Sequence, residues 1–211
     1  LAALDPARIG ADYLAELPAW RSSADLRLFR EKISSMVEDT SSTGTLYLRI
    51  PLLSPTPIPV PSETNHFRNS RGPTIQGFEA LLTYRPGPRS WVQLGHATIR
   101  IEADDSDPNG ARKENSAPQN STFLFSSWDL GKGWQLSGAH YQVGSFGWMS
   151  GPGGRVSGYH RTDARLAYRF PTPIGRGLFT VTGQSLGGDY ADYRPDQSMD
   201  RRVFASISLE L

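Results

Sequence analysis

Cysteine is absent from this sequence of 211 residues, which excludes disulfide frameworks and thiolate metal sites. A strong net charge is also missing, because 22 Lys and Arg residues nearly balance 21 Asp and Glu residues, giving a formal net charge of +1. The overall charge therefore does not indicate nucleic acid or another polyanion as a partner.

Long hydrophobic runs are lacking as well, since no apolar stretch approaches the roughly 18 residues of a transmembrane helix. A membrane-spanning β-strand needs only about 9–11 residues of alternating polarity. Hydropathy averaging hides such strands, so the mean hydropathy of -0.43 does not exclude a β-barrel.

Patterns for catalysis and metal binding are missing too. The four histidines show none of the close spacings of a zinc site: His66, His96, His140 and His160. Gly183-Gln-Ser-Leu-Gly187 matches the Gly-x-Ser-x-Gly pattern, but it leads into the expected loop 188–200 and not into a helix, so it does not support a hydrolase elbow. No glycine-rich stretch precedes an expected helix as a phosphate loop would. We therefore expect no enzyme, no cofactor and no catalytic or metal-binding residue. One calcium-binding loop within 103–117 stays open, on Asp104, Asp105, Asp107 and Asn109.

Alternation of apolar and polar residues is the main pattern that is present. In the last eleven residues the apolar series falls on one side of an expected strand: Val203, Ala205, Ile207, Leu209 and Leu211. The opposite side is mostly polar, from Arg202 to Glu210. This period of two is typical of a strand with one apolar face. It recurs through the chain, most clearly over 160–170, where Leu166 and Tyr168 alternate with Arg165 and Arg169.

Two stretches alternate less regularly. Residues 20–32 fit a strand, although Leu26, Phe29 and Ile33 also fit a helical period; the neighbouring strands favour the strand. Over 91–102 the apolar phase slips, which predicts a β-bulge near Gly95.

The expected connections between strands alternate in length. The short ones are 18–19, 86–88, 131–133 and 171–175, and the long polar ones are 37–73, 103–117, 147–155 and 188–200. Residues 37–73 hold six prolines and many Ser, Thr and Asn residues, so we expect a long loop without a central strand, apart from a short strand near Leu46. Short turns at one rim and long loops at the other are typical of outer-membrane barrels.

Aromatic residues lie near the expected short turns, in the manner of an interfacial girdle: Trp20, Tyr84, Trp91, Trp128, Trp134, Tyr168 and Phe170. The chain contains about nine strands, whereas a closed bacterial barrel has an even number. The charged faces would crowd a small barrel and indicate a wide lumen. Those charges are Asp12, Glu16, Arg27, Glu79, Arg85, Asp163, Arg165 and Glu210.

These pieces, in this order, resemble the C-terminal β-barrel part of a TonB-dependent outer-membrane receptor. The resemblance is carried by Ala24-Asp-Leu-Arg-Leu-Phe-Arg30, Gly77-Phe-Glu79, Tyr84-Arg-Pro-Gly87, Ser116-Ala-Pro118, Gly133-Trp134, Arg165-Leu-Ala-Tyr-Arg-Phe170, Gly187-Gly-Asp-Tyr190 and the strand 202–211. One departure is Leu211, where such barrels commonly end in an aromatic residue.

The resemblance implies an all-β fold: an antiparallel up-and-down transmembrane β-barrel segment of about nine strands, the open part of a 22-stranded barrel. Residues 1–211 would be one domain, the C-terminal portion of the barrel, with 37–73 as an extracellular loop. The implied function is TonB-dependent uptake of a scarce small-molecule ligand, such as a ferric siderophore, across the outer membrane of a Gram-negative bacterium. The implied partners are outer-membrane lipid, an N-terminal plug domain and the TonB energy-coupling protein. Neither the plug nor the coupling segment is found in this sequence, so we expect the chain to be a piece of a longer protein.

Ligand contacts are expected in the long loops and the upper lumen wall: Asn65, His66, Phe67, Arg68, Trp148, Tyr190 and Tyr193. The alternative hypothesis is a soluble β-sandwich that binds a carbohydrate or another ligand. In a sandwich the apolar faces pack against each other, whereas in a barrel they face lipid.

Overall fold

A computed structural model describes residues 6–49, 56–104, 110–147, 154–194 and 196–210. Most of these residues are in β-strands, with one short helix, α1 (Gly110–Glu114), and one 3-10 turn, η1 (Pro18–Trp20). Within the described residues, no helix has the length and apolar character needed to cross a membrane.

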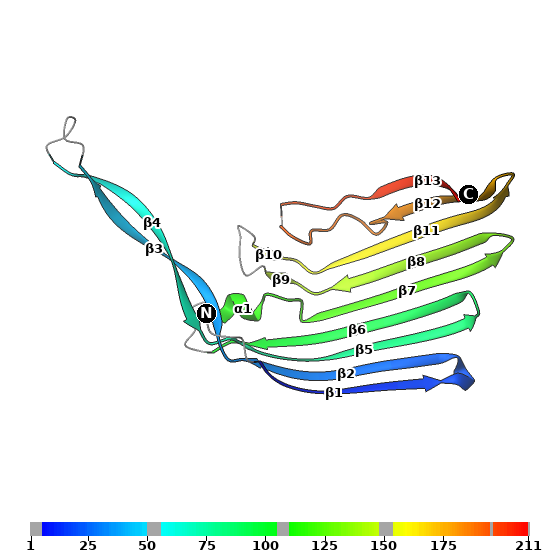
Figure 1. The fold of residues 1–211 in the computed structure, drawn as a ribbon, viewed down its shortest axis with the longest axis horizontal. Helices are drawn as coiled ribbons and strands as arrows, with labels where there is room; N and C mark the ends of the chain where they lie inside the picture. Colours follow the sequence, from blue (N-terminus) through cyan, green and yellow to red (C-terminus); the bar gives the residue numbers. More distant parts are fainter. Residues whose placement is uncertain (1–5, 50–55, 105–109, 148–153, 195, 211) are drawn as a thin grey trace.

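Nine strands form one large antiparallel sheet in the order β1-β2-β5-β6-β7-β8-β11-β12-β13 (Figure 1). Their bounds are β1 Pro6–Leu17, β2 Ser22–Ile33, β5 Thr74–Gly87, β6 Ser90–Glu102, β7 Asn120–Gly131, β8 Trp134–Val143, β11 Tyr159–Thr172, β12 Gly175–Gln184 and β13 Arg202–Glu210. The predicted all-β fold and the strand count are confirmed, and β2 is a strand, so the helical alternative for that stretch is wrong. Strands β1 and β13 lie at the two edges, and across the described residues they do not pair with each other.

Connections between consecutive strands alternate in length, as predicted. Four tight turns lie at one end of the sheet, and four long connections lie at the other (Figure 1). Both β1 and β13 run toward the tight-turn end, because Leu17 pairs beside the first turn and Glu210 pairs with Arg176 beside the last. We call these the short-turn end and the long-connection end.

The first long connection contains the largest departure from expectation. Instead of an irregular loop, residues 37–73 contain most of a β-hairpin, β3 (Met36–Leu48) with β4 (Ile58–Ser70), which projects beyond the sheet (Figure 1). We call this hairpin the arm. Pro59 and Pro61 pair with Tyr47 and Thr45, at alternate positions of β4. Alternate N–H groups of a two-stranded hairpin point to its free edge, so prolines spaced by two remove no ladder hydrogen bond.

The predicted bulge near Gly95 is also wrong. Gly95 pairs in unbroken register with Leu81 and Phe123, and the irregularities of neighbouring pairs lie at Tyr84/Gly87 and Asp129/Gly131. A Cβ atom on Gly95 would lie 2.1 Å from the Phe123 ring. The glycine therefore makes room for an aromatic ring on the neighbouring strand, and the change of apolar phase needs no extra residue.

Cross-strand pairing sorts the side chains onto two faces. The apolar face carries a run of aliphatic residues that are 38–57% exposed: Leu28, Leu82, Leu94, Leu124, Leu136 and Leu166. The charged face carries Arg27, Glu79, Asp163 and Arg165 among its members. Side chains on the charged face crowd together although, among the residues that the structure describes, no second sheet covers them; Ala167, for example, is 1% exposed. The sheet is therefore concave toward the charged face, and the predicted face pattern is confirmed.

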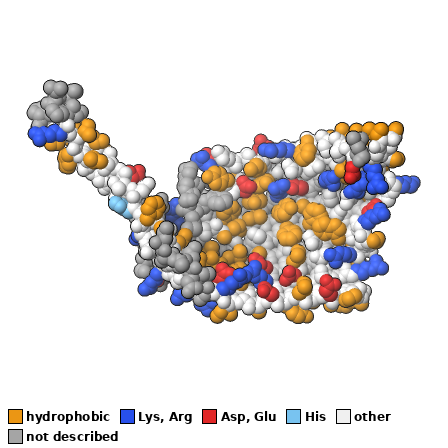
Figure 2. All heavy atoms as spheres, viewed as in Figure 1, with side chains coloured by type: hydrophobic (Ala, Val, Ile, Leu, Met, Phe, Trp, Pro, Cys, Tyr) orange, Lys and Arg blue, Asp and Glu red, His pale blue; other side chains and the backbone are white. Residues whose placement is uncertain are grey.

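This arrangement contradicts the β-sandwich alternative. In the described part of the chain, the other two sheets have only two strands each, β3 with β4, and β9 (Phe146–Gly147) with β10 (Arg155–Val156). None of these described sheets packs on the apolar face, whose leucines are exposed. Figure 2 shows one face of the molecule, on which charged and hydrophobic side chains are interspersed.

Polar side chains replace apolar ones toward the long-connection end of the apolar face, and the changeover is staggered from strand to strand. It falls between Leu28 and Arg30 on β2, and between Ala164 and Thr162 on β11. If the pairing register is followed from β11 across the four strands between it and β2, Ala164 stands on the same row as Ser22. The changeover thus shifts by about six residues, ~20 Å, over five spacings of ~4.8 Å. That ratio corresponds to strands tilted by ~40°, as in membrane barrels.

Most of the predicted aromatic girdle lies on the apolar face at the short-turn end, where Trp134 and Tyr168 stack with ring centroids 4.5 Å apart. Trp91 does not belong to it. Trp91 pairs with Ser127 on the charged face and stacks on Phe125 at 4.6 Å. The sequence placed this residue at the correct end of its strand but on the wrong face.

Candidate functional site

The charged face contains an ion-pair network on β1, β2 and β5. Arg27 lies 3.6 Å from Asp12 and 3.3 Å from Glu79, and its guanidinium lies over the Phe29 ring at 5.2 Å. These groups are partly exposed, so the network adds little to stability and mainly fixes the direction of the arginine. A groove of about 420 Å³ beside it is lined by Arg27, Glu79 and Phe123 among others.

A second cluster lies on the same face at the long-connection end, around Arg161 of β11. The Arg161 guanidinium makes a two-pronged contact with Asp163, at 3.0 Å from Nε and 2.6 Å from an Nη atom. It also donates to the Tyr190 hydroxyl at 3.2 Å. Its carbon lies 5.7 Å from the Tyr141 ring centre and 5.9 Å from that of Tyr190. Tyr190 stacks on Tyr159 at 4.6 Å, and we call these five residues the tyrosine–arginine cluster.

Strand geometry brings this cluster together. Every second residue of a strand points to the same face, so residues 159, 161 and 163 lie on one face of β11. Tyr141 of β8 pairs directly with Arg161. Tyr190 comes from the connection between β12 and β13, where it pairs with Met199 and is 8% exposed. Within the described part of the chain, the hydroxyls of Tyr141 and Tyr159 have no hydrogen-bond partner. The cluster thus offers flat aromatic faces, phenol hydroxyls and an oriented cation, which suit an anionic or aromatic ligand.

The predicted ligand residues are spread over two places. Four lie on β4 in the arm: Asn65, His66, Phe67 and Arg68. Of these, Phe67 is 79% exposed, His66 contacts the Ser42 hydroxyl at 3.1 Å, and Arg68 pairs with Glu38 at 3.4 Å. Tyr190 belongs to the tyrosine–arginine cluster and Tyr193 is half exposed nearby in the chain, whereas Trp148 lies outside the described residues.

Sequence reasoning did not identify Arg161 as part of a site. Its alternation with Thr162 placed it on the charged face, and that placement holds. Its proximity to Tyr190 depends on how the connection 185–201 folds back, which no local pattern encodes. His160 lies on the opposite face from Arg161, with the centroid of its ring 5.9 Å from that of His140.

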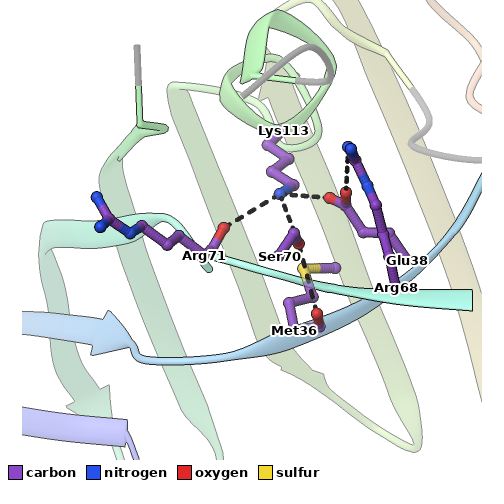
Figure 3. Close-up of polar contacts among 6 residues, drawn as sticks. All are labelled: Met36, Glu38, Arg68, Ser70, Arg71 and Lys113. Atoms are coloured by element: carbon purple, nitrogen blue, oxygen red, sulfur yellow. Dashed lines mark hydrogen bonds and ion pairs between the residues drawn. The ribbon is translucent and has the colours of Figure 1, made fainter. Parts of the chain in front are cut away.

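The base of the arm is fixed by a buried ion pair from another connection (Figure 3). Lys113 of α1 is 2% exposed and pairs with Glu38 of β3, which is 8% exposed. The Lys113 ammonium also lies 3.3 Å from the Arg71 carbonyl and 3.5 Å from the Ser70 hydroxyl. A surface ion pair of Arg71 with Asp104, at 2.9 Å, joins the same two connections. The helix α1 therefore holds the root of the arm.

No group of three metal-binding side chains was found among the described residues. Three residues of the possible calcium loop, Asp105, Asp107 and Asn109, lie outside those residues, so that expectation is not tested. The fourth, Asp104, is engaged by Arg71.

Comparison with known proteins gives a match to a family model and matches among solved structures. A family model described as TonB dependent receptor-like, beta-barrel matches residues 9–196. Among solved structures, the chain is similar to the ferric-catecholate import receptor Fiu from K12 E. coli in its closed form, with a TM-score of 0.62 and 16% identity. That similarity covers 96% of this chain and 26% of the other, so the chain spans about a quarter of its length. A search of curated proteins finds no match.

Proposed function

The chain belongs to the TonB dependent receptor-like β-barrel family, and we propose that it forms the C-terminal part of the barrel of an outer-membrane receptor for a scarce ligand. One observation carries the proposal: an exposed apolar face with a staggered polar changeover backs directly onto a concave charged face. The apolar face would contact lipid, and the charged face would line a wide lumen. The role proposed is transport, not catalysis.

In this proposal residues 1–211 are one portion of a 22-stranded barrel, and further strands pair with the free edges of β1 and β13. A plug domain would occupy the lumen against groups such as Arg27 and Glu79. TonB would supply energy from the inner membrane. The protein would lie in the outer membrane of a Gram-negative bacterium, with the long connections, including 37–73, outside the cell.

The proposed ligand is a ferric siderophore, and a catecholate is the first class to test because the similar receptor Fiu imports ferric catecholates. The arm residues Asn65, His66, Phe67 and Arg68, together with Trp148 and Tyr193, would meet the ligand first. Tyr190 would then hold it at the lumen wall. The tyrosine–arginine cluster supports this route, because an anionic catecholate complex can stack on phenol rings and accept hydrogen bonds from tyrosine hydroxyls and arginine.

Replacing Arg161 by Gln should raise the Kd for a ferric tris-catecholate about tenfold or more, because a charge-assisted hydrogen bond contributes roughly 1.5–3 kcal/mol. Binding and energised uptake of ⁵⁵Fe-labelled complex would be measured in cells that produce the complete receptor. Arg165→Gln is the matched control, since Arg165 lies four residues from Arg161 on the same face of β11 and outside the cluster.

Normal ferric-complex binding by the Arg161→Gln receptor, or an equal loss with Arg165→Gln, would remove the cluster from the ligand route. Absence of uptake by the wild-type receptor for every iron chelate tested, with normal insertion in the outer membrane, would refute the siderophore class. A wild-type protein found only in the soluble fraction would refute the transport proposal itself.

A further inference from the structure

A groove on the apolar face crosses β1, β2, β5 and β6, at the polar changeover on β2 and β5 and among the polar residues beyond it on β6. Its volume is about 580 Å³. One row of its lining residues is mostly apolar: Ala11, Leu28, Phe78 and Thr98. The next row toward the long-connection end is Ile9, Arg30, Gln76 and Arg100, and it carries both cations. The groove therefore has an apolar floor and a cationic end.

We propose that this groove binds a phosphate-bearing lipid of the outer leaflet, with Arg30 and Arg100 holding the phosphate and the apolar floor holding acyl chain. The inference rests on the proposed function, because the groove meets lipid only if the apolar face is embedded. The ligand class follows from the two arginines together with their level on the strand.

Register places the two guanidinium groups on the same row. Arg30 pairs with Gln76, and Gln76 pairs with Arg100, so the arginines stand two strand spacings apart, ~10 Å at their Cα atoms. Arginine side chains are long enough to converge on one anion from this separation, and a planar guanidinium matches phosphate geometry. The amide of Gln76 lies between them as a further donor.

Acidic side chains of the protein do not fully neutralise Arg30 and Arg100, so both guanidinium groups can bind an anion. Across the described residues, Arg30 has no acidic partner, and its sequence neighbour Glu31 lies on the opposite face, paired with Arg8 at 2.9 Å. Arg100 uses only its Nε for Glu102, at 2.9 Å, and is 72% exposed. Two cations with one acid at a membrane surface favour an anionic headgroup over a zwitterionic one.

The paired arginines distinguish this part of the polar changeover from the neighbouring strands. On the neighbouring strands β7, β8 and β11 the polar side chains at this boundary are neutral or histidine: Asn120, Thr122, Gln142, His140, His160 and Thr162. The paired arginines are confined to the part of the belt that also contains the groove. A surface that contacts lipid without specificity would not require a groove and two arginines at the same place on the sheet.

The immediate test is lipid binding by the complete receptor reconstituted in nanodiscs of phosphatidylethanolamine. Native mass spectrometry would count bound diphosphoryl lipid A, monophosphoryl lipid A and added inorganic phosphate. We expect tighter binding of the diphosphoryl lipid, a three- to fivefold loss with Arg30→Gln or Arg100→Gln, and a loss of at least tenfold with both. Arg165→Gln, on the charged face, should bind as wild type.

Equal binding by the double variant and wild type would overturn the inference, as would an equal loss with Arg165→Gln. Competition by millimolar inorganic phosphate would show an anion site without a lipid. In each of these results the receptor still enters nanodiscs, so the transport proposal stands; a protein that does not insert at all would refute that proposal instead.

Discussion

Leu136→Arg should destabilise the folded protein in the membrane by about 2–4 kcal/mol, the cost of an arginine on the lipid face near the bilayer midplane. Leu136 lies on the apolar face of β8, is 43% exposed and pairs with Leu166 and Trp128. It is midway between the polar changeover and the girdle residue Trp134. Urea titration of the folded fraction in lipid vesicles, followed by its heat-modifiable mobility on gels, measures the change.

The matched control is Gln135→Arg, one residue earlier on the same strand and on the opposite face. Gln135 pairs with Asp129 and would place the new cation beside a carboxylate in the lumen. We expect the free energy of unfolding to change by less than about 1 kcal/mol. The substitution removes the hydrogen bond between Gln135 and Ser127 but adds a solvated ion pair, and each of these contributes little. Equal effects at the two positions would contradict the assignment of the faces.

Lys113→Met should release the arm from the sheet, because it takes the buried ammonium away from the buried carboxylate of Glu38, while Arg68 stays at 3.4 Å. Removal of one partner of a buried ion pair costs roughly 3–5 kcal/mol, and the lower end applies here because Arg68 stays. The cost is local to α1 and the root of β3. Hydrogen exchange of Val37, Glu38 and the α1 amides should therefore accelerate about a hundredfold, while β7 and β8 exchange as before.

A double variant, Lys113→Met with Glu38→Leu, tests the cause. It removes both charges and substitutes apolar groups of similar volume, so protection of the arm root should largely return. Lys132→Met, at the short-turn end, serves as a control for loss of a lysine and should change nothing at the arm. Persistent deprotection in the double variant would mean that packing, and not the buried pair, holds the arm.

The sequence predicted the large sheet well because alternation is a local property. Leu166 and Arg165 are neighbours in a strand, so their positions alone assign them to opposite faces, and the same rule predicted the two faces of β13. The turn chemistry at Lys132–Gly133 and Pro173–Ile174 then placed the short-turn end.

Where prediction failed, the cause was a contact between distant segments. Prolines near Pro59 indicated a loop, but β4 has only one partner strand and tolerates them on its free edge. The slip at Gly95 indicated a bulge, but the glycine accommodates the ring of Phe123. The Lys113–Glu38 pair joins residues 75 positions apart in the sequence, and neither residue lies in a pattern that marks it as buried.

Site-directed labelling of single cysteines tests the central claim most directly, and the absence of native cysteine makes each label unique. In receptor reconstituted into vesicles, labels at Leu166 and Leu209 should be quenched by lipid-borne spin probes and shielded from water-soluble ones. Labels at Arg165 and Glu210, one residue away on the charged face, should show the reverse. Quenching by water-soluble probes at all four positions, or burial of Leu166 and Leu209 from both kinds of probe, would contradict a lipid-facing apolar sheet.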